Sequence, residues 1–112
     1  MNQSIASLVQ TLSNLLEKSS IKIALAESCT GGLLAAHLTA QAGSSLWFDR
    51  GFVTYSNASK IESVGVSPSI IEQYGAVSEE VAKAMAQGAL NHSAAKTSIA
   101  ITGIAGPGGS TE

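Results

Sequence analysis

The chain has 112 residues, 45% of them hydrophobic and 12% charged, so its composition predicts one globular domain rather than a disordered segment. Its formal net charge is -2 and its Lys and Arg residues are scattered, which argues against a nucleic-acid-binding protein with a clustered basic face. The single cysteine excludes an internal disulfide, and no apolar run approaches the roughly 20 residues of a membrane span. We therefore expect a cytoplasmic protein that binds neither nucleic acid nor membrane.

The first half of the chain predicts a helix, a strand and a second helix. Apolar residues at three- and four-residue spacings between Ile5 and Leu16 predict an amphipathic helix that ends at Ser19-Ser20. The run from Ile21 to Ala26 predicts a short strand that is buried on both faces. A helical pattern resumes after Gly31-Gly32 and stops near Gly43.

The second half repeats this alternation. In chain order, its segments predict a strand from Gly51 to Ser56, a short helix from Asn57 to Val64, a helical turn opened by Ser67-Pro68, a long helix capped by Ser78, and a strand from Thr97 to Thr102. Strands that alternate with helices are typical of parallel sheets. The pattern therefore predicts a three-layer α/β/α domain with a largely parallel sheet.

Three loops are candidates for a ligand site. In α/β sheets, ligands bind beyond the carboxyl ends of the strands. That rule selects residues 27 to 32, 56 to 60 and 103 to 109, which are rich in hydroxyls, glycine or charge. We expect the three loops to meet on one rim of the domain.

The first loop carries the heptapeptide A-E-S-C-T-G-G, at positions 26 to 32. Ser28 lies between a strand and a helix start, where unpaired backbone amides can hold an anion or an oxyanion. Gly31 and Gly32 allow a ligand to approach the backbone closely. Two interpretations stay open: Ser28 or Thr30 caps the helix, or the loop binds substrate, with Glu27 orienting a substrate group or balancing the helix dipole.

A serine needs a base to act as a nucleophile, and Lys60 on the second loop is the candidate. A lysine among apolar walls loses charge stabilisation, so its pKa falls and its neutral amine can accept a proton. Tyr55 is a candidate proton relay or oxyanion donor. The two histidines, His37 and His92, are interpreted as helix residues without a catalytic role.

The third loop, G-I-A-G-P-G-G, begins at Gly103. Its spacing matches neither the dinucleotide fingerprint nor a P-loop, but its amides, including those of Gly106 and Gly108, can cradle a phosphate. Thr102 precedes the loop and either contacts the ligand or ends the strand; a flexible tail is the alternative for the whole loop. Asp, Glu, His and Cys residues show no metal-ligand spacing, so no metal is expected.

Four motifs occur in a fixed order: A-E-S-C-T-G-G, G-S-S-x-W-F-D-R-G-F-V-T-Y-S-N-x-x-K, G-A-V-S-E-E-V-A-x-A-M-A-x-G-A and T-G-I-A-G-P-G-G. Together they resemble the CinA C-terminal domain family, the nicotinamide-nucleotide amidohydrolases, over about residues 25 to 109. The resemblance implies an α/β/α fold. It also implies hydrolysis of the carboxamide of nicotinamide mononucleotide to nicotinic acid mononucleotide and ammonia, in pyridine-nucleotide recycling, with no metal or organic cofactor.

The resemblance also implies roles for individual residues. Ser28 is expected to be the nucleophile, Lys60 its base and Tyr55 an assisting hydroxyl. Ser45 and Thr102 are expected in the same pocket, beside the glycine-rich third loop. Ser45 and Cys29 remain alternative nucleophiles. The partners expected are the small-molecule substrate and further copies of the chain in a homo-oligomer.

The family's domain continues past the glycine loop into a further strand and a closing helix. The resemblance therefore predicts that residues 1 to 112 form one domain shortened at its C-terminus. Two alternatives to an amidohydrolase follow: a non-catalytic nucleotide-binding module linked to competence or DNA-damage responses, and a fragment that truncation has made inert. A binding module would keep its ligand affinity when Lys60 is replaced by methionine, whereas an amidohydrolase would lose turnover.

Overall fold

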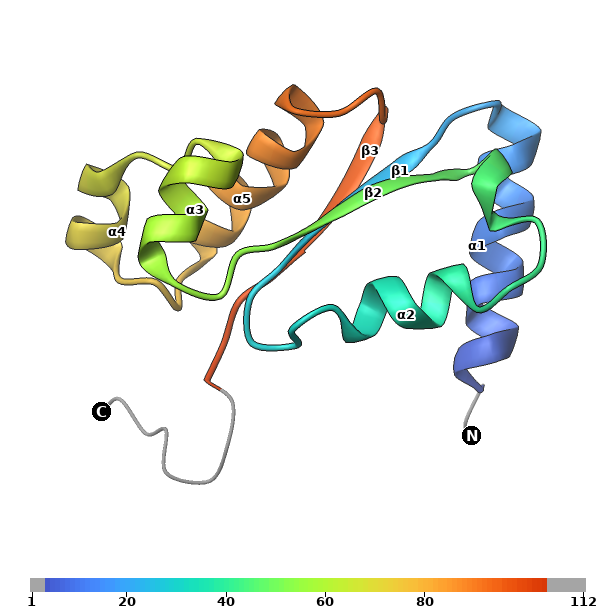
Figure 1. The fold of residues 1–112 in the computed structure, drawn as a ribbon, viewed down its shortest axis with the longest axis horizontal. Coiled ribbons are helices and arrows are strands. Elements are labelled where there is room, and N and C mark those ends of the chain that lie inside the picture. The colour runs from blue at the N-terminus through green and yellow to red at the C-terminus, as the bar shows by residue number, and fades with distance from the viewer. Residues whose placement is uncertain (1–3, 105–112) are drawn as a thin grey trace.

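Three parallel strands form the centre of the domain in the computed structural model, which describes residues 4–104 (Figure 1). The sheet order is β2-β1-β3, and the strands are β1 (Ile23–Glu27), β2 (Phe48–Val53) and β3 (Thr97–Ile101). Glu27, the last residue of β1, pairs with Val53 on one side and Ile101 on the other. All three strands therefore end at the same edge of the sheet.

Helices cover both faces of the sheet and complete three layers. They are α1 (Ile5–Ser19), α2 (Leu33–Thr39), α3 (Asn57–Val64), α4 (Pro68–Tyr74), α5 (Glu79–Asn91) and the short 3-10 turn η1 (Ser44–Leu46). In Figure 1, α3, α4 and α5 lie on one side of the sheet and α1 and α2 on the other. The predicted α/β/α architecture with a parallel sheet is confirmed. Within residues 4–104, no helix combines the length and hydropathy that a membrane crossing requires.

The central strand β1 supplies both hydrophobic cores because its side chains alternate between the two faces. All five of its residues are buried, as its continuous apolar run predicts. Ala24 and Ala26 join the core beneath α3 and α5, made with Val64, Val66, Val81, Met85, Ala89 and Ala95. Ile23 and Leu25 join the core beneath α1 and α2, made with Val9, Leu16, Leu38 and Trp47.

Strand β2 begins three residues earlier than predicted and ends at Val53. It is an edge strand, so charged side chains are tolerated within it. Arg50 is exposed there, and Asp49 accepts hydrogen bonds from Arg50 Nε (2.9 Å) and the Ala94 amide (3.2 Å). The Thr54 amide makes the last hydrogen bond to β1, donating to the Glu27 carbonyl at 2.8 Å, and the chain leaves the sheet after it. The carboxyl end of β2 thus turns toward α3.

Helices α3 and α5 approach each other most closely at Gly88. A Cβ at this position would lie 1.9 Å from the carbonyl oxygen of Val64, the last residue of α3. Only a residue without a side chain permits that approach. Serines cap α1, α3 and α5, where Ser4, Ser56 and Ser78 each accept a hydrogen bond from an amide of the first turn.

Candidate active site

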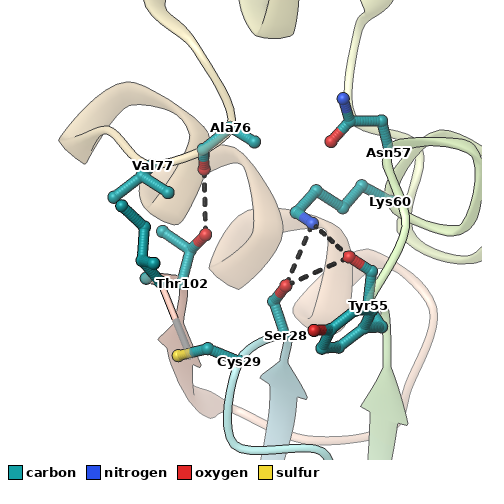
Figure 2. Close-up of a pocket in the computed structure, with 10 residues that line it drawn as sticks. Ser28, Cys29, Tyr55, Asn57, Lys60, Ala76, Val77 and Thr102 are labelled. Carbon is teal, nitrogen blue, oxygen red and sulfur yellow. Dashed lines mark hydrogen bonds between the residues drawn. The ribbon is translucent and has the colours of Figure 1, made fainter. Parts of the chain in front are cut away.

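A cavity of about 270 Å³ opens at the carboxyl edge of the sheet (Figure 2). Its walls come from the loops after β1, β2 and β3 and from the connection between α4 and α5. The lining residues are Ser28, Cys29, Tyr55, Asn57, Lys60, Ala76, Val77, Thr102, Gly103 and Ile104. The described parts of the three predicted loops therefore meet on one rim.

Ser28 and Lys60, 32 positions apart in the chain, lie in direct contact in this cavity. Lys60 Nζ is 3.1 Å from Ser28 Oγ, and both side chains point into the space between β1 and α3 in Figure 2. Ser28 follows β1 directly, and its amide donates to the Ile101 carbonyl at 2.9 Å. Lys60 lies in the first turn of α3, whose start is fixed by the Ser56 cap. The two groups are thus held by a sheet edge and a capped helix.

The surroundings of Lys60 disfavour its charged form. The residue is 2% exposed, and its Nζ donates to the carbonyl oxygens of Thr54 and Tyr55, each at 3.1 Å. Burial lowers the pKa of the Lys60 amine, and the electrostatic influence of the neighbouring Cys29 opposes this in part. Within the described part of the chain, no carboxylate forms an ion pair with Lys60. The Lys60 amine therefore loses its proton more easily than the amine of an exposed lysine does.

The three acceptors around Lys60 Nζ suit both of its protonation states. A charged ammonium has three donors for Ser28 Oγ and the two carbonyls, while the Ser28 hydroxyl donates to the Tyr55 carbonyl at 3.3 Å. A neutral amine donates to the two carbonyls and keeps a lone pair for the Ser28 proton. Proton transfer between the two side chains thus needs no rearrangement of heavy atoms.

Glu27 does not line the cavity, and its carboxylate is turned toward the start of α2. It is 1% exposed and accepts four hydrogen bonds: from Thr30 Oγ1 (2.6 Å), and from the amides of Gly32 (3.2 Å), Leu34 (3.0 Å) and Ala35 (2.8 Å). Burial raises the pKa of Glu27, but these hydrogen bonds outweigh it, so the pKa lies below its ordinary value. The carboxylate caps α2, which agrees with the second interpretation of Glu27, a carboxylate that balances the helix dipole.

This cap occupies the amides of Gly32, Leu34 and Ala35, so these three are not free to bind an anion. The N-cap of α2 is Gly32, at φ 108°, which has no side chain to accept a hydrogen bond. Neither Ser28 nor Thr30 is the N-cap; Thr30 Oγ1 instead donates to Glu27. Gly31 has φ 61°, so both positions of the turn use backbone conformations that favour glycine.

Tyr55 lines the cavity, and its main chain contacts the Ser28–Lys60 pair. Its side chain is 65% exposed, while its carbonyl oxygen accepts hydrogen bonds from Ser28 and Lys60. Cys29 is half-buried in the cavity wall, and a Cβ on Gly103 would lie 3.1 Å from its sulfur. The sulfur points away from Lys60 in Figure 2, so Ser28 is better placed than Cys29 to be activated by the amine.

Thr102 and Gly103 line the cavity from the end of β3. The Thr102 hydroxyl donates to the Ala76 carbonyl at 2.9 Å, which ties the end of the strand to the loop before α5. The predicted site residues Gly106 and Gly108 lie outside the described residues.

Ser45 is not part of this cavity, contrary to the expectation. It is exposed in η1, before the start of β2, where Phe48 pairs with Ile23 at the amino end of β1. Ser28 follows the opposite end of β1, so the two serines lie at opposite edges of the sheet. Ser45 is therefore excluded as a partner of Lys60 within one chain.

The histidines lie apart from the cavity. His37 lines an apolar groove between α1 and α2, and His92 Nδ1 lies 2.8 Å from the Gly88 carbonyl at the end of α5. Among the residues that the structure describes, no group of three His, Cys, Asp or Glu side chains is arranged to hold a metal ion.

Asn57, Ala76, Val77 and Ile104 line the cavity but were not predicted as site residues. Asn57 lies on the second loop selected by the strand-end rule, so its position was a usable signal. Ala76 and Val77 belong to a connection between two helices, which the rule does not consider. Figure 2 shows the Asn57 amide above Lys60 at the rim.

The family profile of the CinA C-terminal domain matches residues 5–112. The chain belongs to the CinA C-terminal domain family. It is 60% identical over 91 residues to a nicotinamide-nucleotide amidohydrolase PncC of Enterobacter agglomerans, an alignment that covers 80% of this chain and 56% of the relative. It is 53% identical over 105 residues to a CinA-like protein of Chlorobium phaeovibrioides, covering 94% of this chain and 24% of that protein.

Solved structures of the family share the fold. The competence/damage inducible protein CihA from Agrobacterium tumefaciens superposes with a TM-score of 0.93 at 44% identity, covering 99% of this chain and 67% of that one. A CinA superfamily protein from Escherichia coli gives a TM-score of 0.92 at 42% identity, covering 96% of this chain and 62% of that one. The chain thus spans about half the length of the amidohydrolase relative and about two thirds of these structures.

Proposed function

We propose that the protein hydrolyses the carboxamide of nicotinamide mononucleotide to nicotinic acid mononucleotide and ammonia, with Ser28 as nucleophile and Lys60 as base. The observation that carries the proposal is the 3.1 Å contact between Ser28 Oγ and the amine of a buried lysine that has no acidic partner in the described part of the chain. The 60% identity to a nicotinamide-nucleotide amidohydrolase supports the choice of substrate.

Acylation begins with the neutral Lys60 amine. Ser28 Oγ attacks the carboxamide carbon while its proton moves to Lys60 Nζ, which the Thr54 and Tyr55 carbonyls then hold as an ammonium. When the tetrahedral intermediate collapses, the carbon–nitrogen bond breaks and Lys60 returns the proton to the leaving nitrogen. Ammonia departs and an ester links the nicotinoyl group to Ser28.

Deacylation uses the same groups in the opposite direction. Water attacks the ester carbon as Lys60 accepts its proton, and the proton returns to Ser28 Oγ as the carboxylate product leaves. Overall, one carboxamide and one water give one carboxylate and one ammonium ion. Lys60 is the basic side chain that lines the cavity within the described residues, and no Asp or Glu lines it there to repel the substrate's phosphate.

The test measures ammonia release from nicotinamide mononucleotide by the folded chain. We expect Ser28→Ala and Lys60→Met to abolish turnover without unfolding the domain. Ser45→Ala is the matched control, because this exposed serine lies at the other edge of the sheet and should leave the rate unchanged. A folded wild-type chain that binds the nucleotide but releases no ammonia would refute the proposal in favour of a binding module.

The pH dependence gives a second test. Only the neutral amine of Lys60 accepts the Ser28 proton, so turnover should rise with pH and level off above the pKa of Lys60 in the enzyme. Burial places that pKa below the ordinary value of 10.5. A rate that falls as the pH rises through the neutral range would contradict a lysine base.

A further inference from the structure

The turn between β1 and α2 pairs three of its five backbone amides, those of residues 28 to 32, within the described structure. The Ser28 amide donates to Ile101, the Gly31 amide to the Ser28 carbonyl (3.0 Å), and the Gly32 amide to the Glu27 carboxylate (3.2 Å). Among residues 28 to 32, two amides have no acceptor within the described part of the chain, those of Cys29 and Thr30. These two follow the nucleophile directly in sequence, and Cys29 lines the cavity.

Glu27 is the group that fixes this turn. Its carboxylate reaches across the turn to donors three to eight positions ahead, so it ties the end of β1 to the first turn of α2. A buried charge is costly unless it is fully hydrogen-bonded, and four donors meet that requirement here. Because the carboxylate takes up the amides of Leu34 and Ala35, the positive end of α2 is neutralised and unavailable to a substrate.

We infer that Glu27 is a positioning residue that holds the backbone amides of Cys29 and Thr30 as the donors to the substrate's oxyanion. This inference rests on the proposed function, since it needs Ser28 as the attacking group. An oxyanion donor must be held in place beside the nucleophile, and it must have no hydrogen-bond acceptor in the free enzyme. Both amides lack an acceptor in the described structure, Cys29 lines the cavity beside Ser28, and Thr30 is held by its hydrogen bond to the buried carboxylate.

The test replaces Glu27 with glutamine, which keeps the shape of the side chain but turns one acceptor oxygen into a donor facing an amide. We expect the turn to shift and kcat for ammonia release to fall about 10²-fold, while KM changes less than about threefold. The pH midpoint of the rate should not move, because Lys60 keeps its contacts. Ser4→Ala is the matched control: it removes the cap of α1, far from the site, and should leave kcat unchanged.

A second measurement separates this inference from the proposed substrate. An alkyl fluorophosphonate phosphorylates activated serines: the bond from Ser28 Oγ to phosphorus forms, fluoride leaves, and Lys60 takes the proton. The phosphoryl oxygen uses the same donors as an oxyanion, so the labelling rate of Ser28, followed by mass spectrometry, should fall about 10²-fold in Glu27→Gln. If the wild type is labelled but releases no ammonia from the nucleotide, the proposed function fails and this inference is still tested.

Thr30→Val is a milder variant in case Glu27→Gln does not fold. It removes the 2.6 Å hydrogen bond to Glu27 but keeps the backbone amide of residue 30. Labelling of Ser28 should slow about tenfold, equivalent to the loss of one hydrogen bond to a charged group. Three results would each overturn the inference. The first is a folded variant that is labelled at the wild-type rate, and the second is a wild type that is not labelled at all. The third is a Glu27→Gln variant with a raised KM at unchanged kcat.

Discussion

Replacing Gly88 with alanine should destabilise the domain through a single backbone clash. The new Cβ would lie 1.9 Å from the Val64 carbonyl oxygen, whereas ordinary van der Waals contact begins at 3.4 Å, so α3 and α5 must separate by about 1.5 Å. That movement loosens the core in which Val64, Val81 and Met85 are buried. Overpacking of this kind costs about 1–3 kcal/mol, and a clash with backbone belongs at the upper end.

Alanine is also a better helix former than glycine by about 1 kcal/mol, which offsets part of this cost. The net destabilisation is therefore about 2 kcal/mol, equivalent to a fall of about 8–16 °C in Tm for a domain of this size. Thermal unfolding followed by circular dichroism measures it. Gly51→Ala is the matched control, because its Cβ would meet Ala35 and Leu25 at 3.6 and 3.7 Å, within ordinary contact. A Gly88→Ala variant with the Tm of the wild type would refute the packing argument.

Four further predictions concern the site and its pH dependence. The folded-state pKa of Lys60 is lowered, so between that pKa and pH 10.5 the unfolded chain binds more protons than the folded one. The free energy of unfolding therefore rises with pH in that window, by at most about 1.36 kcal/mol per pH unit, and urea titrations of Lys60→Met should lack this component. The pKa of Glu27 is also lowered, so its contribution is present above pH 4.5 and lost as the pH falls through the folded-state value; acid titration of Glu27→Gln should show a flatter acid limb. Gly32→Ala should lower the free energy of unfolding by about 1–3 kcal/mol because a side chain is strained at a φ of 108°. The cost is not steric, since the nearest atom to the new Cβ, Val53 Cγ2, lies at an ordinary 3.6 Å. An unchanged midpoint in chemical unfolding would show that the turn relaxes. Thr102→Val removes the hydrogen bond to Ala76 and should cost about 1 kcal/mol while ammonia release stays within about threefold; a total loss would make the hydroxyl part of the chemistry.

The parallel sheet and its helices follow from local patterns in the sequence. β1 is predictable because a strand buried on both faces needs a continuous apolar run, and α3 and α5 because serine caps mark their starts. The start of β2 was missed because an edge strand tolerates Asp49 and Arg50, which break the apolar pattern. The buried strand β1 has a continuous apolar pattern that predicts it, whereas the partly exposed strand β2 does not.

The meeting of Ser28 and Lys60 was predictable because both follow strands that end at one edge of the sheet. The capping role of Glu27 was not predictable, because its partners lie up to eight positions ahead in the sequence. The N-cap of α2 is also a glycine, which has no side chain to accept a hydrogen bond and so gives no capping signal. Ser45 was placed with the site by resemblance alone, although it precedes β2 rather than following it. A strand-end rule applied to every candidate would have excluded it.

The contacts that hold the Lys60 amine beside Ser28 come from main-chain carbonyls, those of Thr54 and Tyr55. A carbonyl oxygen is the same whatever side chain its residue carries. Positions 54 and 55 can therefore accept other residues that preserve the backbone path without changing the acceptors around the amine. Genetic variation can remove the pair itself only by replacing the serine or the lysine; a substitution elsewhere reaches the pair only through the course of the backbone.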